Sequence, residues 1–311
     1  MLAFESKDAW TPADLESAGV LDFKAAQAVE GFLTGLHASP HHGFSVEFAE
    51  HRLFNTGEST RHLDWKLLAR TDKFFTKRYE EETNLRAHLL VDASASMFYP
   101  ATGTSKWEFS LRTAAALTHV FRRQRDAYGL LLCDYQLRRL VRPGLGKSHH
   151  HTVMLHLQKA LSARAEDYGK KTALVESLHE LAETMPSRSL LLVFSDCFEP
   201  GLQPDALVSA LQHLRYNRHE VLLFQVLDQK TEARFEWNHG PYRLVDPESG
   251  QEMKLNPSEY REAYVQAYKD FTTELRLRCG QLKIDLVEAD CQNGFGDVLE
   301  GYLRQRSKRS R

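Results

Sequence analysis

Five short apolar runs recur along the chain and have the composition of buried strands. They are AHLLVD (87–92), YGLLLCD (128–134), SLLLVFSD (189–196), EVLLFQVLD (220–228) and KIDLVEA (283–289). Because apolar residues fill both alternating positions, each run is expected to be covered on two faces, as strands of a parallel sheet are.

Between these runs, apolar side chains recur three or four residues apart, which predicts helices that pack one face on the core. The three stripes are Trp107, Leu111, Ala114, Thr118 and Phe121; Leu174, Leu178, Leu181 and Met185; and Tyr264, Tyr268, Phe271 and Leu275. Since strands and helices alternate, residues 87–311 are predicted to form an α/β domain with a doubly wound, mostly parallel sheet.

Two regions interrupt this alternation. Residues 230–256 contain the turn sequence DPESGQE and predict a β-hairpin or irregular insertion before a long helix that follows Pro257. Residues 1–86 are expected to form an N-terminal unit, with a helix from about Asp22 to Leu36 and an extended segment after HASPHHG. This unit is too rich in large apolar side chains for a disordered arm, so it is predicted to pack on the main domain.

Composition excludes several classes of protein. The chain carries 40 Lys and Arg against 42 Asp and Glu, a net charge of −2, which argues against a general nucleic-acid binder. The four cysteines are scattered without a Cys-x-x-Cys pair and are expected to be reduced. No apolar run approaches the roughly 18 residues of a membrane span. We therefore expect a cytoplasmic protein that does not insert into a membrane.

Candidate metal ligands follow two of the apolar runs. A buried carboxylate needs a partner for its charge. Asp92 and Asp196 each end a run, and the carboxyl ends of parallel strands meet at one edge of a sheet. Ser94 and Ser96 lie in the loop after Asp92, and Thr172 precedes a helix. This all-oxygen set favours Mg²⁺, with Mn²⁺ as a substitute. The alternative is that these side chains cap helices without a metal.

The order of these residues resembles a known metal site. Asp-x-Ser-x-Ser in the loop after the first strand, followed by Thr172 and then FSD, is similar to the metal-ion-dependent adhesion site (MIDAS) of von Willebrand factor A domains.

A longer stretch, from Gly43 to Met97, resembles the bacterial von Willebrand A-like family called domain of unknown function 58 (DUF58). The family pattern includes R-x-I-D-W-K, A-R-T, E-E-E and D-x-S-x-S-M, and this sequence has RHLDWK, ART, EEE and DASASM. It departs from the pattern, while keeping size or charge, at Phe54, Glu58 and Leu63. The resemblance implies a von Willebrand A (Rossmann-like) fold and an accessory protein of MoxR-type AAA+ ATPases that aids maturation or assembly of target proteins.

Two functions are open. The first is a non-enzymatic docking module, in which a bound Mg²⁺ accepts an acidic ligand from a MoxR-like ATPase or from a client protein. The second is a Mg²⁺-dependent, phosphatase-like hydrolase that uses an aspartyl nucleophile. Such hydrolases need a second carboxylate two residues after the first, and Ser94 stands there instead. We therefore favour docking.

Three further features of the sequence are candidates for a function. A charged cluster beside an aromatic residue is either an ion-pair seam within the protein or a partner-binding surface; its members are Arg61, Asp64, Trp65, Lys66 and Arg70. The run His149–His151 is a poor zinc site, because adjacent histidines do not easily face one ion, and GLGKS lacks the longer P-loop pattern. Cys197 is expected to be a buried thiol rather than a nucleophile.

Overall fold

The computed structural model describes residues 12–38, 51–53, 75–77, 85–168, 172–197, 204–238, 240–248 and 250–309. The chain divides into two compact units, Met1–Glu30 with Leu85–Arg311, and Gly31–Asn84. The second contains an antiparallel pair of strands, β1 (His51–Leu53) and β2 (Phe75–Lys77). That residues 1–86 pack on the main domain stays a prediction. The charged cluster at 61–70 lies outside the described residues.

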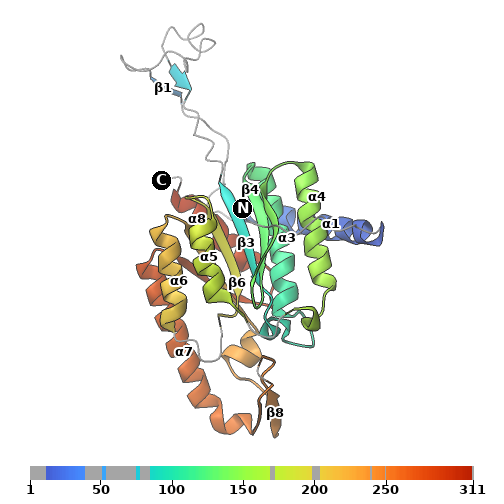
Figure 1. Cartoon of the computed structure of the whole chain (residues 1–311), viewed down its shortest axis with the longest axis vertical. Helices are drawn as coiled ribbons and strands as arrows, with labels where there is room; N and C mark the ends of the chain where they lie inside the picture. Colours follow the sequence, from blue (N-terminus) through green and yellow to red (C-terminus); the bar gives the residue numbers. More distant parts are fainter. Residues whose placement is uncertain are drawn as a thin grey trace. The chain divides into compact units, whose positions relative to one another are not determined.

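A central sheet of six strands organises the first unit (Figure 1), in the order β10-β7-β6-β3-β4-β5. All five predicted strands are present, and they pair in parallel. The strands are β3 (Arg86–Asp92), β4 (Ala127–Cys133), β5 (Leu137–Gly144), β6 (Leu190–Ser195), β7 (Glu220–Leu227) and β10 (Asp285–Asp290). The predicted α/β fold with a mostly parallel, doubly wound sheet is confirmed.

Strand β5 was not predicted. It pairs antiparallel with β4 and forms the edge of the sheet, with only Leu140 and Val141 buried. An edge strand has one neighbour and is only half covered, so its sequence, LRRLVRPG, lacks the continuous apolar run of the inner strands.

Helices flank the sheet and follow the predicted stripes. They are α1 (Pro12–Ala38), α3 (Lys106–Gln124), α4 (Lys147–Ser162), α5 (Leu174–Thr184), α6 (Pro204–Tyr216), α7 (Pro257–Gln281) and α8 (Gly296–Arg309). The predicted hairpin is present before α7 as β8 (Tyr242–Val245) and β9 (Glu252–Leu255). Helix α1 begins earlier than the predicted start near Asp22, and Asp14 in its first turn favours the positive end of the helix dipole. No helix in the described ranges combines the length and apolar character needed to cross a membrane.

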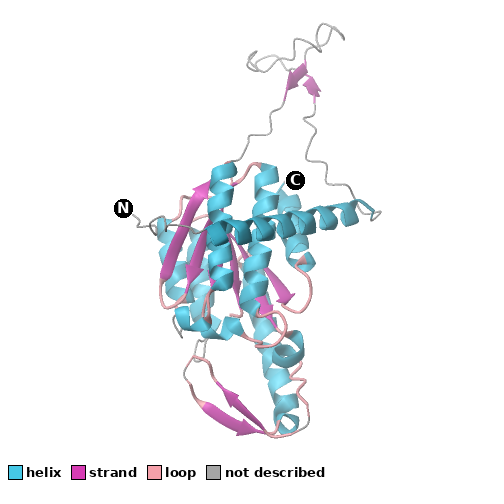
Figure 2. Ribbon diagram, turned by 90° about the vertical axis from the view of Figure 1, so that its right-hand side faces the viewer, coloured by secondary structure: helices cyan, strands magenta, loops and turns pink. Residues whose placement is uncertain are grey.

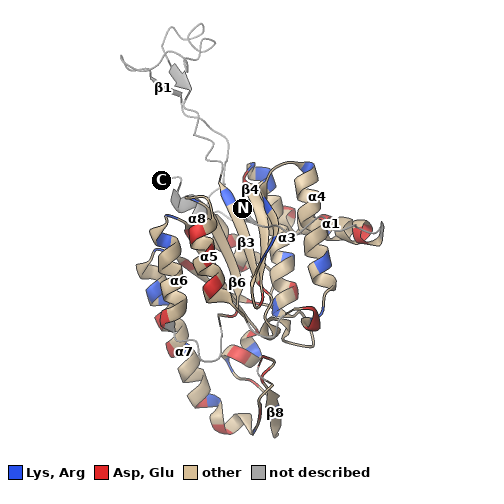
Figure 3. Cartoon of the chain, viewed as in Figure 1, with Lys and Arg blue, Asp and Glu red and all other residues tan. Residues whose placement is uncertain are grey.

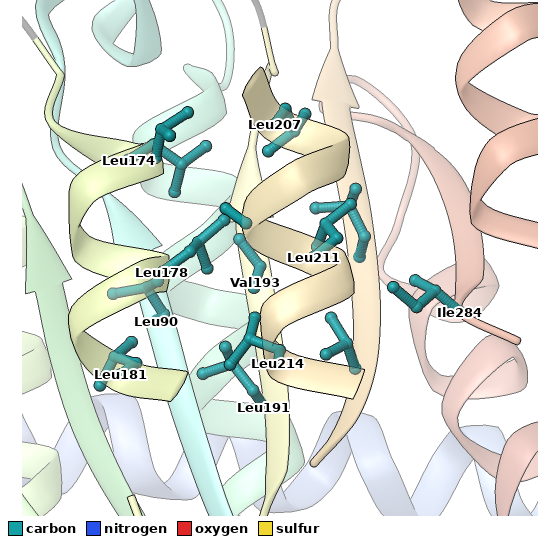
Figure 4. Packing of buried hydrophobic residues seen from close by; sticks show 14 of the residues in the cluster. Leu90, Leu174, Leu178, Leu181, Leu191, Val193, Leu207, Leu211, Leu214 and Ile284 are labelled. Carbon is teal, nitrogen blue, oxygen red and sulfur yellow. The ribbon is translucent and has the colours of Figure 1, made fainter. Parts of the chain in front are cut away.

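Alternate side chains of the strands enter two separate layers of core. On one face, Leu90, Leu191 and Val193 pack with Leu178 of α5 and Leu211 of α6 (Figure 4). Charged side chains lie mainly on helices and loops, and the inner strands β3 and β6 are nearly free of them (Figure 3). The apolar runs therefore form strands because both of their faces are covered.

The other face carries aromatic contacts. Phe194 stacks on Phe224 with ring centroids 4.8 Å apart, and Phe121 of α3 contacts Tyr128 of β4 and Tyr302 of α8. Helix α1 lies outside this layer and runs across α3 and α4 (Figure 2), with Leu21, Ala25 and Val29 buried.

The strand order reverses between β3 and β6. From β3 the chain moves one way to β4 and β5, and from β6 it moves the other way to β7 and β10. The loops after β3 and β6 therefore diverge, and this switch point is where open α/β sheets bind ligands. Asp92 and Asp196 lie at the carboxyl ends of these two strands.

The core assignment predicts the effect of one substitution. Leu178 of α5 is fully buried, so Leu178→Ala is expected to lower the free energy of unfolding by about 2–5 kcal/mol. Leu277→Ala, at a residue 63% exposed on α7, is the control and should change it by less than about 0.5 kcal/mol. Urea unfolding followed by circular dichroism measures both, and equal losses would contradict the assignment.

Candidate metal site

Asp92 organises the loop after β3. The last rung to β4 is the bond from Ala93 N to Cys133 O, at 2.6 Å, after which the chain leaves the sheet in a short 3₁₀ turn, Ala95–Phe98. Ser94 N donates to Asp92 Oδ1 at 2.9 Å, and the hydroxyl oxygens of Ser94 and Ser96 lie 3.1 Å apart. The structure therefore gathers Asp92, Ser94 and Ser96 into one cluster, in which Asp92 and Ser94 are buried.

The second carboxylate oxygen of Asp92 connects β3 to β6. Ser195 Oγ donates to Asp92 Oδ2 at 2.7 Å and accepts a bond from Cys197 N at 3.0 Å. Ser195 was not among the predicted site residues, and it fixes the carboxylate between the two strand ends at the switch point.

Asp196 is paired with a buried lysine. Lys106, the first residue of α3, places its Nζ 2.8 Å from Asp196 Oδ2 and 2.6 Å from Glu232 Oε1. The lysine is only 1% exposed; burial alone would lower its pKa, but the two carboxylate charges outweigh burial and raise the pKa above its usual range. Sequence reasoning missed both Lys106 and Glu232.

Glu232 lies on a single π-helical turn, Gln229–Ala233, that follows β7. Its Oε2 accepts a bond from Asp228 N at 2.8 Å, so the carboxylate is held from both sides. Burial raises the pKa of Glu232 even beside Lys106. This turn therefore delivers a carboxylate to the switch point.

The charge of Asp92 is not balanced by these contacts. Burial and the neighbouring charge of Asp196 raise the pKa of Asp92 to about 6, although hydrogen bonds from Ser195 and Ser94 oppose the shift. A bound cation would remove this cost, because it would favour the ionised carboxylate.

The capping alternative is weak for two of the predicted ligands. Ser94 stands at the N-cap of the 3₁₀ turn, but its side chain makes no capping hydrogen bond. Helix α5 starts at Leu174 with Ala173 as its N-cap, so Thr172 does not cap it. The Thr172 Oγ1 atom lies near the thiol of Cys133, the residue of β4 that pairs with Asp92 of β3. This oxygen is buried without a well-formed hydrogen bond to any described residue.

A cavity of about 260 Å³ opens beside the cluster. Ser96, Asp196 and Glu232 line one part of it, and Asp246 and Glu248 from the hairpin turn, with Tyr264 and Tyr268 of α7, line another. Gln225 also lines the cavity, and its buried Oε1 has no hydrogen-bond partner among the described residues. The cluster is therefore reached through a space large enough for a side chain.

Cys197 and the histidine run are not arranged as a nucleophile or as one shared metal site. Burial and the charge of Asp196 raise the pKa of the Cys197 thiol well above its ordinary value, which disfavours a nucleophilic thiolate. His149 Nε2 lies 2.6 Å from Tyr128 O, whereas His150 Nε2 lies 2.7 Å from Asp22 Oδ1. The adjacent histidines thus face different partners, as predicted.

Residues 50–274 match the family described as protein of unknown function DUF58. The chain belongs to this family. Proteins described as uncharacterized from Mycobacterium bovis and Mycobacterium tuberculosis are 26% identical to this DUF58 chain over 242 residues, which cover 76% of this chain and 73% of theirs. All five predicted metal ligands lie within the DUF58 region.

Solved structures with lower similarity also match. The conserved hypothetical protein BatB from Bacteroides thetaiotaomicron has a TM-score of 0.48 and 13% identity, covering 72% of the DUF58 chain and 99% of its own. The manganese-loaded TRAP protein of Plasmodium vivax has a TM-score of 0.35 and 17% identity, covering 46% and 57%.

Removing the buried lysine, Lys106, should lower the free energy of unfolding. Lys106→Met leaves the Asp196 and Glu232 carboxylates without their cation, and a broken buried ion pair typically costs about 3–5 kcal/mol of unfolding free energy. Arg112→Met is the control on the same helix, because the exposed pair with Glu108 contributes about 0–1 kcal/mol. Urea unfolding of both variants at pH 7 tests this, and similar small losses would contradict a structural role for Lys106.

The raised pKa of Asp92 predicts a pH dependence without metal. The folded-state pKa of Asp92, about 6, exceeds its ordinary value of 3.8. The contribution of Asp92 to the free energy of unfolding is therefore fully present below about pH 4, and it falls by up to about 3 kcal/mol as the pH rises through 6. Asp92→Asn lacks this ionisation. In EDTA the variant should therefore be more stable than wild type at pH 7.5, and the difference should vanish near pH 4. A difference that does not change with pH would refute the assignment.

Proposed function

We propose that this DUF58 chain is a non-enzymatic, Mg²⁺-dependent protein-interaction module that acts in the cytoplasm. The observation that carries the proposal is the oxygen cluster at the switch point, where Asp92, Ser94 and Ser96 converge beside a cavity. Asp196 and Thr172 complete the proposed ligand set for Mg²⁺, for which Mn²⁺ would substitute.

The residues fit a hard cation. Carboxylate and hydroxyl oxygens are the ligands that Mg²⁺ takes in proteins, and it keeps several waters when only one or two carboxylates bind it. Asp92 carries negative charge that burial and Asp196 make unfavourable, and the Thr172 hydroxyl is buried without a well-formed hydrogen bond to a described residue. When bound, the ion would supply positive charge and open coordination positions.

A docking role follows from those open positions. An Asp or Glu of a second protein could enter the cavity and ligate the ion, a charge-assisted contact stronger than an exposed salt bridge. The family resemblance points to a MoxR-type AAA+ ATPase, or its client, as the partner, with this chain as an adaptor in protein maturation or assembly.

The rival proposal is a Mg²⁺-dependent, phosphatase-like hydrolase. The cavity would admit a small phosphate ester, and this observation keeps the rival under test. Two features disfavour it. Asp92 is 1% exposed with both carboxylate oxygens hydrogen-bonded, which leaves it poorly placed as a nucleophile. Ser94 stands where the general acid would be needed.

The metal and its use are tested together. Mn²⁺ titrated into wild type should bind at one site, which Asp92→Ala abolishes and Asp290→Ala, at the strand end of β10, leaves intact. Association with a MoxR-type ATPase should require Mg²⁺ and be lost in EDTA. Ser96→Ala and Thr172→Ala should weaken it while the thermal stability of the metal-free protein changes little.

Each of these experiments has a result that would contradict the proposal. Equal Mn²⁺ affinity of wild type and Asp92→Ala would remove the metal site. Association unchanged by EDTA would remove its role in docking. Steady hydrolysis of p-nitrophenyl phosphate by wild type, lost in Asp92→Ala, would favour the hydrolase.

A further inference from the structure

Three helices, α1, α3 and α4, bring potential metal ligands together. Asp22 of α1, His119 of α3 and His150 of α4 each direct one ligand atom to a common region, and these atoms all lie within 4.8 Å of one another. Asp22 Oδ1 is 2.7 Å from His150 Nε2 and 2.8 Å from His119 Nε2. The crossing of α1 over the other two helices produces this convergence (Figure 2).

His150 is held as metal-binding histidines usually are. Its ring is 3% exposed, and its Nδ1 lies 2.7 Å from the hydroxyl of Tyr128 in β4. With a proton on Nδ1 donated to that oxygen, the lone pair of Nε2 points toward Asp22. A hydrogen bond to the far ring nitrogen is the common outer-shell support for a ligating histidine.

His119 also faces Asp22. Its Nε2 lies at hydrogen-bonding distance from the carboxylate, although the ring is poorly aligned for a hydrogen bond. The His119 and His150 rings meet edge to face, with centroids 4.8 Å apart. The two imidazole nitrogens therefore converge on one region, which is the geometry of shared ligation.

The chemistry of the three side chains also suits a cation. Two neutral imidazoles and one carboxylate form a ligand set for a transition metal. Arg122 is a nearby positive charge that opposes the ion.

We propose that Asp22, His119 and His150 form a second metal site that binds Zn²⁺. Three protein ligands leave a fourth position for water or an added ligand, and the partial exposure of Asp22, at 38%, leaves that side open. The site differs in chemistry from the all-oxygen cluster at Asp92. Asp22 also lies outside the DUF58 region, residues 50–274, so the site requires α1 as well as the family domain.

Co²⁺ substitution tests the proposal directly. The full-length chain, stripped with a chelator, should take up one equivalent of Co²⁺ and develop the visible absorption of a four- or five-coordinate nitrogen and oxygen site, which one equivalent of Zn²⁺ removes. The same spectrum should appear in Asp92→Ala, so its presence or absence is independent of the Mg²⁺ proposal.

Three variants give the matched comparison. His119→Gln and Asp22→Asn should each lower Zn²⁺ affinity, measured by calorimetry, by at least about 100-fold, since even outer-shell losses cost about 10–100-fold. His151→Gln, at an exposed neighbour of His150, should leave affinity unchanged. Circular dichroism confirms folding, and Asp22→Asn retains the size and most hydrogen bonding of the native side chain.

Two results would overturn the site. A Co²⁺ complex without the visible bands of a low-coordinate site would show that the three residues form only a hydrogen-bonded network. Zn²⁺ affinity unchanged in both Asp22→Asn and His119→Gln would show that bound zinc lies elsewhere on a chain with 15 histidines. A rise in thermal stability with Zn²⁺ in wild type, absent in both variants, would support the site.

Discussion

The buried ammonium of Lys106 joins three elements at the carboxyl edge of the sheet, two of which carry carboxylates that would otherwise repel each other. It stands at the start of α3, contacts Asp196 after β6 and reaches Glu232 on the π-helical turn after β7. Without this cation, two carboxylates would be buried beside a third, that of Asp92. Because an unpaired buried charge is so costly, the positions of these three elements are coupled through one side chain.

The same arrangement leaves a defined electrostatic imbalance. Lys106 compensates Asp196 and Glu232, whereas Asp92 is held by neutral donors, Ser94 N and the Ser195 hydroxyl. The fold thus concentrates negative charge at the switch point and neutralises only part of it. A small cation at this site would bind to preformed oxygens without rearrangement of the chain, because the proposed ligands lie on strand ends and tight turns.

The local pattern of apolar residues predicted the inner strands and the helix stripes. A strand that is covered on both faces must be apolar at every position, and a helix that packs on the core must be apolar along one stripe, whichever residues they contact. This pattern did not predict β5, an edge strand whose sequence contains Arg138, Arg139 and Arg142. It found Asp92 and Ser94 through their short spacing. It missed Lys106 and Glu232, since a buried ion pair looks like surface charge until the packing of distant elements is known. The same limit hid the convergence of Asp22 and His119 with His150, which come from three separate helices.

The hydrogen bond from Ser195 to Asp92 joins residues 103 positions apart in the chain. Closing so long a loop costs conformational entropy that is recovered only when β3 and β6 pair in register, and such non-local parallel pairing forms slowly during folding. The oxygen cluster is therefore completed only as the central sheet is assembled. Partly folded forms in which β6 has not joined β3 lack the oriented carboxylate, so any recognition at this edge would depend on the pairing of these two central strands.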